Sequence, residues 1–194
     1  MELLDQIKFL LRITDTHDIV RRYFVVNGFD GALAMLGLII GFIVSMPVEI
    51  STVINACLGA AIALGASGIS SAYITEAAEL KNSLAKLEDA MVSDLQESSH
   101  GKAARITPFI IALVNGLAPL AISILILTPL WLSHVGYSTF ISPLYASAIV
   151  ALIITFLLGV FLGRIAKSSW LRSGLQAMLV ALLTALLIYI FAES

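Results

Sequence analysis

One carboxylate stands inside a long apolar stretch of this chain. Asp30 is the single charged residue in 25–42, VVNGFDGALAMLGLIIGF. A charge near the bilayer midplane costs about 2.5–3.5 kcal/mol on insertion scales, so such residues face a wet cavity or a cation. Asn27 lies one turn earlier and Met35 lies on roughly the adjoining face. An amide, a carboxylate and a thioether suit a divalent transition metal. We therefore expect Asp30 to bind a cation, with Asn27 and Met35 as weaker candidates.

Another interpretation gives Asp30 a structural role. Asp is a favoured N-cap, and the apolar run from Gly31 onward could begin a helix at the membrane interface. However, 16 residues from Gly31 to Met46 span roughly 24 Å, less than the roughly 30 Å of hydrocarbon. The length favours a span that begins earlier and places Asp30 inside the bilayer.

A second group of acids follows the second apolar stretch. Two carboxylate pairs have i, i+3 spacing: Glu76 with Glu79, and Asp94 with Glu97. On one straight helix the pairs would lie roughly 27 Å apart. If the helix broke between them and folded back, four carboxylates could form an oxygen cage for a divalent cation, and His100 could add an imidazole. The alternative is a solvated charged face offset by Lys81 and Lys86.

The composition indicates what kind of protein carries these acidic residues. Of 194 residues, 59% are hydrophobic and 12% are charged, and the mean hydropathy is +1.00. Soluble proteins average about 25% charged residues, so we expect an integral membrane protein. The single cysteine, Cys57, excludes a disulfide framework. GxSxG, HExxH and glycine-rich phosphate motifs are absent and the three histidines are scattered, which argues against an enzyme.

Five apolar segments are long enough to cross the bilayer, which predicts an all-α protein with five transmembrane helices. They cover residues 23–46, 50–73, 106–132, 142–163 and 170–191. Pro47 separates the first two, and turns are expected at 133–137 and 164–169. All eleven Lys and Arg residues precede the first span or follow the second or fourth. The positive-inside rule then predicts a cytoplasmic N-terminus and a C-terminus outside.

The chain divides into four parts within one transmembrane domain. Residues 1–22 form an N-terminal amphipathic cytoplasmic segment, either on the inner membrane surface or packed on the cytosolic loop. Residues 23–74 hold spans one and two, 75–105 an acidic cytoplasmic helical loop, and 106–194 spans three to five. The stretch 71–97 lacks Gly and Pro and repeats Leu at helical spacing, so the second helix should continue to Glu97.

Small residues predict close packing between the spans. Gly37 with Gly41 and Gly159 with Gly163 form GxxxG motifs. In the third span, a Gly-x-x-Pro motif, Gly116 to Pro119, could loosen the backbone ladder and expose carbonyls to a cavity. Asn115 beside it is a further weak metal-ligand candidate.

Four stretches resemble the vacuolar iron transporter family in order and spacing. They are IVRRYFVVNGFDGALAMLGLIIG, GASGISSAYITEAAELK, TPFIIALVNGLAPLAI and FLLGVFLGRIAKSSWLRSGLQ. The resemblance covers nearly all of the chain from Ile19 and identifies it as a divergent, short member. It departs in two respects: residues 62–64 lack the family's second-span methionine, and the inner loop is short.

The resemblance implies a five-span homodimer that moves Fe²⁺, often also Mn²⁺, out of the cytoplasm in exchange for protons. Asp30 matches the family's membrane carboxylate, and Glu76 and Glu79 fall where its cytosolic helix begins to present metal-binding glutamates. Fe²⁺ or Mn²⁺ would be the transported ion, with no permanently bound cofactor. The expected partners are the lipid bilayer, metal cations, protons and a second copy, without nucleic acid, at the cell membrane if the source is prokaryotic. The alternatives are a non-transporting scaffold, a metal sensor, or a transporter of another cation.

Overall fold

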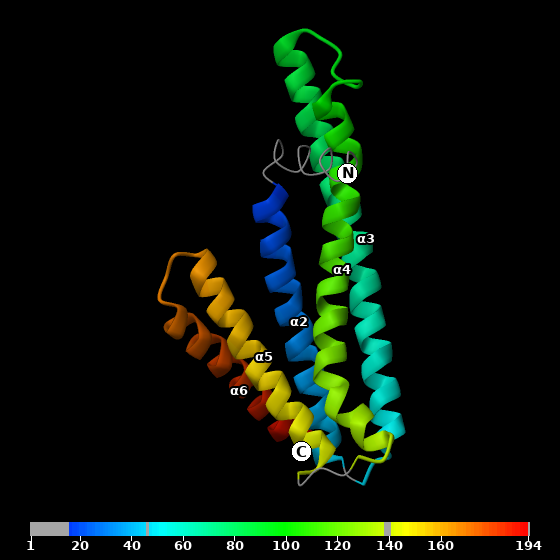
Figure 1. Cartoon of the computed structure of the whole chain (residues 1–194), viewed down its shortest axis with the longest axis vertical. Coiled ribbons are helices and arrows are strands. Elements are labelled where there is room, and N and C mark those ends of the chain that lie inside the picture. Colours follow the sequence, from blue (N-terminus) through cyan, green and yellow to red (C-terminus); the bar gives the residue numbers. More distant parts are fainter. Residues whose placement is uncertain (1–15, 46, 138–140, 194) are drawn as a thin grey trace. The chain divides into compact units, whose positions relative to one another are not determined.

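The computed structural model describes residues 16–45, 47–137 and 141–193, and all regular structure in these ranges is helical. The helices are α2 (Thr16–Val44), α3 (Ile50–Met91), α4 (Ser99–His134), α5 (Pro143–Ile165) and α6 (Trp170–Glu193) (Figure 1). All five are long and apolar enough to cross a membrane. The prediction of an all-α, multi-pass membrane protein with five spans is confirmed.

Helix α2 begins earlier than the expected first span. It starts at Thr16 and continues without a break to Val44, so residues 16–22 belong to the same helix as the span. The rest of the expected amphipathic segment, residues 1–15, lies outside the described residues. The helix ends as expected before Pro47, which cannot continue a helical hydrogen-bond ladder.

Helix α3 ends earlier than the sequence predicts. It passes from the membrane segment into the acidic segment but ends at Met91. The prediction that the helix continues to Glu97 is therefore wrong. Val92 has φ +51°, a left-handed conformation that is rare for a β-branched residue. The next helix is capped by Ser98, whose Oγ accepts a hydrogen bond from the Gly101 N–H at 3.3 Å. A serine side chain thus helps to begin the helix by accepting a backbone hydrogen bond, in a segment that has no Pro.

The remaining connections agree with the expected turns. Helix α4 ends at His134, and Gly136 follows with φ +100°, a conformation that glycine adopts without steric cost. The link between α5 and α6 lies at residues 166–169, inside the predicted turn.

The chain forms two compact units, each of which contains parts of α2, α3 and α4. Unit 1 comprises the residues up to Phe24 and Gly65–Leu117, and therefore holds the acidic segment. Unit 2 comprises Val25–Leu64 and the chain from Ala118 onward, including α5 and α6. Asp30 belongs to unit 2, whereas Glu76, Glu79, Asp94, Glu97 and His100 belong to unit 1.

In unit 1, α3 and α4 approach each other closely through small residues. The side-chain amide nitrogen of buried Asn115 donates to the Gly68 carbonyl at 2.7 Å. A Cβ on Gly116 would collide with the Gly65 carbonyl and with the Ile69 side chain. Asn115 and Gly116 are buried and therefore contribute to helix packing. The structure does not expose these two residues to a cavity, as the sequence had suggested.

In unit 2, an apolar core joins the membrane helices. It includes fully buried Met35, Ile39, Cys57 and Ile126. Helices α5 and α6 form an antiparallel pair (Figure 1).

In unit 2, both glycines of the Gly159/Gly163 motif make the close helix contacts that the sequence predicts. A Cβ on Gly159 would meet the Ala177 Cβ, and one on Gly163 would lie 2.7 Å from the Ser173 Oγ. In the Gly37/Gly41 motif, only Gly37 makes such a contact. A Cβ on Gly37 would lie 3.0 Å from the Ile188 Cδ1, whereas Gly41 has no such neighbour within 4 Å.

Candidate functional site

Asp30 lies in the interior of α2. The helix begins at Thr16, so Asp30 is not the N-cap of a helix that starts at Gly31, and that alternative is excluded. Its side chain is exposed in the single chain, and it is the one exposed residue between positions 27 and 44. Around it, α2 faces other helices of unit 2 through half-buried and buried apolar residues. The carboxylate is therefore directed away from the core of its own unit.

The backbone beside Asp30 is packed tightly. A Cβ on the next residue, Gly31, would lie 2.8 Å from the Pro119 Cα and 2.9 Å from its carbonyl oxygen. Both residues belong to unit 2 and both are buried. Pro119 has no N–H and interrupts the hydrogen-bond ladder of α4 at this level. Helix α4 thus holds the segment of α2 that carries the carboxylate in a fixed position.

The weaker candidates on α2 differ from each other. Asn27 is half-buried, one turn before Asp30. Met35 is fully buried among apolar side chains of unit 2, so its thioether packs in the core and does not share the exposed position of Asp30. Asp30 and Met35 are five positions apart, which on an α-helix corresponds to about 140° around the axis. Met35 therefore does not lie on a face next to Asp30, and that expectation is wrong.

The Glu76/Glu79 pair is split between a buried and an exposed position. Glu76 is 7% exposed, and its Oε1 accepts a hydrogen bond from the Tyr23 hydroxyl at 2.8 Å. Glu79, one turn later, is exposed. Tyr23 is a residue that sequence reasoning missed, because its partner lies 53 positions away and no local pattern connects them.

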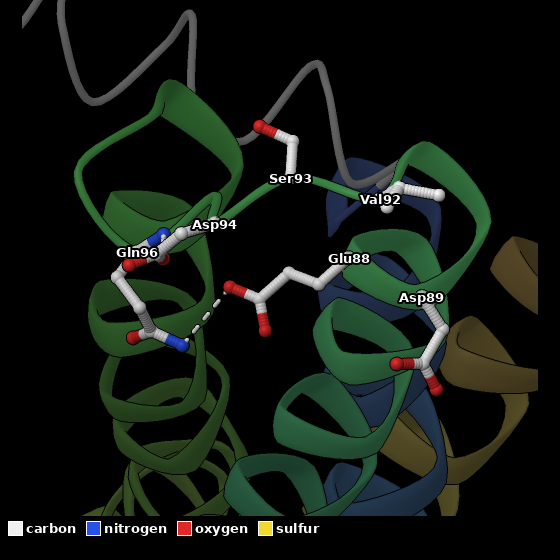
Figure 2. A pocket seen from close by; sticks show the side chains of 6 residues that line it. All are labelled: Glu88, Asp89, Val92, Ser93, Asp94 and Gln96. Atoms are coloured by element: carbon white, nitrogen blue, oxygen red, sulfur yellow. Dashed lines mark hydrogen bonds between the residues drawn. The ribbon is translucent and has the colours of Figure 1, made fainter.

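Glu88 and Asp94 organise the connection between α3 and α4. Oε1 of Glu88 accepts hydrogen bonds from the Leu95 N–H at 3.0 Å and from the Gln96 side-chain amide at 3.2 Å. Oδ1 of Asp94 accepts from the Gln96 N–H at 2.9 Å. Figure 2 shows Glu88 extending toward Gln96, while the Asp89 carboxylate points in another direction. These residues border an open cavity of about 580 Å³, together with Val92 and Ser93.

The fold-back does not assemble the four carboxylates of the expected cage. Since α3 turns just after Met91, Asp94 comes next to Glu88, which lies roughly 18 Å along the helix from Glu76. His100 is exposed and lines a small cavity with Leu80 and Leu84, apart from these acids. Within the described ranges, no three His, Cys, Asp or Glu side chains converge in a way that could hold a metal ion.

Comparisons with known proteins place the chain in a family. The VIT family pattern matches residues 61–193, well over half of the chain, and this range includes the acidic segment but begins after Asp30. An uncharacterized protein of Methanocaldococcus jannaschii is 31% identical over 176 residues, which cover 89% of this chain and 88% of the relative. No solved structure matches the chain. The chain therefore belongs to the VIT family, the vacuolar iron transporters, whose members are membrane transporters of iron or manganese rather than enzymes.

Proposed function

We propose that this protein exports Fe²⁺ or Mn²⁺ from the cytoplasm in exchange for protons and that Asp30 binds the ion within the first span. The observation that carries the proposal is the position of Asp30, an exposed carboxylate in the interior of an apolar membrane helix. Inserting such a charge costs up to about 2.5–3.5 kcal/mol. Among the described residues of unit 2, no hydrogen bond or ion pair to Asp30 offsets this cost, so a role in binding a cation explains the residue better than a structural role.

A carboxylate also supplies a basis for exchange. An ionised carboxylate binds a divalent cation, whereas a protonated one does not, so metal and proton compete for the same oxygen atoms. A proton arriving from outside would release the metal, and a metal arriving from the cytoplasm would release the proton. Asp30 would supply the carboxylate for this competition, and Asn27, half-buried one turn away, could add an amide oxygen.

An acidic segment on the cytoplasmic side would support the proposed direction of export. Ten of the eleven Lys and Arg residues lie before the first span, between the second and third, or between the fourth and fifth, and the eleventh, Arg172, is the third residue of the fifth span. By the positive-inside rule the acidic segment then faces the cytoplasm and the C-terminus lies outside. Exposed Glu79, Asp94 and Glu97, with buried Glu76, would attract or gate the ion on the cytoplasmic side.

We also propose that the protein is a homodimer. In unit 2, small or polar residues of α3 are also exposed at helical spacing, and Gly59 among them has no neighbour within 4 Å of an added Cβ. The face consists of Thr52, Asn55, Ala56, Gly59 and Ala63. Small faces allow membrane helices to approach closely, so this face suits a second copy of the chain.

Metal uptake into proteoliposomes tests the proposal. The purified protein is reconstituted in vesicles whose interior is acidic and holds a pH-sensitive dye, and Mn²⁺ or Fe²⁺ is added outside. We expect metal accumulation together with a rise in internal pH, and slower accumulation when both sides have the same pH. Metal binding to the protein without accumulation would contradict transport and support a sensor or scaffold. Accumulation without proton movement would contradict the exchange.

A further inference from the structure

A groove runs between α3 and α4 within unit 1. Two cavities of about 340 Å³ each lie along it and share Tyr73 as a lining residue. Pro108 lines one cavity and its neighbour Phe109 lines the other, so the two cavities adjoin on α4 as well as on α3. The groove therefore extends over more than one helical turn and changes its chemistry along its length.

One end of the groove is apolar. Its walls include Ile69, Tyr73, Phe109 and Leu113, which are 38%, 48%, 62% and 41% exposed. These residues lie in or at the edge of the apolar segments of α3 and α4, which place them at the bilayer. A hollow of this kind, open to the bilayer, is suited to a hydrocarbon chain.

The other end of the groove is cationic. Lys81 of α3 and Arg105 of α4 both line it and both are exposed. Helical side chains lean toward the N-terminus of their own helix, so on these two antiparallel helices Lys81 leans toward Tyr73 and Arg105 leans toward Gln96. An Arg105 Nη2 hydrogen bond to the Gln96 Oε1, at 3.4 Å, agrees with this direction. None of the described residues lining this cavity is an acid, which leaves two positive charges facing it.

We propose that this groove binds one anionic glycerophospholipid, with its phosphate at Lys81 and Arg105 and an acyl chain along Ile69, Phe109 and Leu113. A ligand with an anionic head and an apolar tail matches the change from cationic to apolar walls on either side of Tyr73. Basic pockets at the ends of membrane helices bind anionic headgroups, with about 1 kcal/mol from each Lys or Arg near the surface. All residues that line this site belong to unit 1, and Asp30 is not among them, so the proposal does not depend on the transported ion.

Native mass spectrometry of the full-length protein in a neutral detergent tests this site. The protein is titrated with phosphatidylglycerol or with phosphatidylcholine carrying the same acyl chains. We expect one phosphatidylglycerol to bind more tightly than phosphatidylcholine. The double variant Lys81→Gln/Arg105→Gln should weaken phosphatidylglycerol binding about 30-fold and leave phosphatidylcholine binding unchanged.

A matched variant on the same two helices controls for net charge. Lys86 and Lys102 are exposed and do not line the groove, so Lys86→Gln/Lys102→Gln should keep the preference for phosphatidylglycerol. The charge-preserving variant Lys81→Arg/Arg105→Lys should keep it too, which separates loss of charge from loss of fold.

Three results would overturn the proposal. The first is equal binding of the two lipids by the unmodified protein. The second is an equal loss of phosphatidylglycerol binding in both glutamine double variants, which would indicate a general charge effect. The third is competition by glycerol 3-phosphate at the same concentration as the lipid, which would indicate a site for free phosphate.

Discussion

The acids of unit 1 and the acid on α2 in unit 2 are held in different ways. In unit 1, Glu76 accepts a hydrogen bond from Tyr23, and Glu88 and Asp94 accept hydrogen bonds that shape the connection after Met91. In unit 2, no hydrogen bond or ion pair joins Asp30 to any residue that the structure describes. The first group contributes to the fold, whereas Asp30 contributes no such contact. This difference supports the proposal that Asp30 binds a cation.

The largest effect on stability should come from the helix contact beside Asp30. Gly31→Ala would place a Cβ 2.8 Å from the Pro119 backbone, and overpacking of this kind costs about 1–3 kcal/mol. Gly41→Ala is the matched control, since its Cβ has no neighbour within 4 Å and alanine favours a helix by up to about 1 kcal/mol. Thermal unfolding in detergent should show opposite shifts. Equal midpoints for the two variants would contradict the close approach of α2 and α4.

Removing the carboxylate of Glu76 should also destabilise the protein. Glu76→Ala removes from a buried position the charged group that accepts the hydrogen bond of Tyr23, at a cost of about 1.5–3 kcal/mol. Glu76→Gln keeps an acceptor oxygen and should recover most of the loss in the unfolding midpoint. If both variants are as stable as the unmodified protein, Glu76 has no structural role and the contrast with Asp30 disappears.

A smaller effect is expected at the connection between α3 and α4. Glu88→Ala removes the acceptor for the Leu95 N–H and the Gln96 side chain, which should cost about 0.5–1.5 kcal/mol locally. Hydrogen exchange of residues 92–98 should accelerate. Asp89→Ala, the neighbouring acid on the same cavity, is the control and should leave exchange unchanged. Equal acceleration in both variants would mean that loss of negative charge, rather than the hydrogen bonds, is responsible.

The smallest effect on stability is expected at Asp30 itself. Asp30→Asn breaks no hydrogen bond or ion pair within the described part of the chain, so the unfolding free energy of the variant should change by no more than about 0.5 kcal/mol. Thermal unfolding in detergent without metal provides the measurement. A loss as large as that of Glu76→Ala would assign Asp30 to the fold rather than to the ion.

The membrane architecture could be predicted from the sequence because each of its signals is local. Apolar length determines the five spans, and Pro47, Gly136 and the polar 166–169 link mark their ends. The position of Asp30 within a span followed from the same length argument. The spacing of Gly159 and Gly163 also predicted correctly that α5 packs closely against a neighbouring helix, α6.

Other features could not be predicted because they depend on distant residues or on backbone conformation. The Tyr23–Glu76 hydrogen bond joins residues 53 positions apart. The end of α3 depends on a left-handed Val92, although the residues around it are compatible with a continuing helix. That turn determines which acids meet, so Asp94 lies near Glu88 and not near Glu76.

The most direct test compares metal uptake by two variants that each lose one negative charge in unit 2. Asp30→Asn and Glu49→Gln, an exposed acid in the connection after α2, are reconstituted at equal density in proteoliposomes with an acidic interior. We predict that Glu49→Gln accumulates Mn²⁺ at the rate of the unmodified protein and that Asp30→Asn accumulates none above empty vesicles. Full accumulation by Asp30→Asn would contradict the binding of the transported ion by this carboxylate.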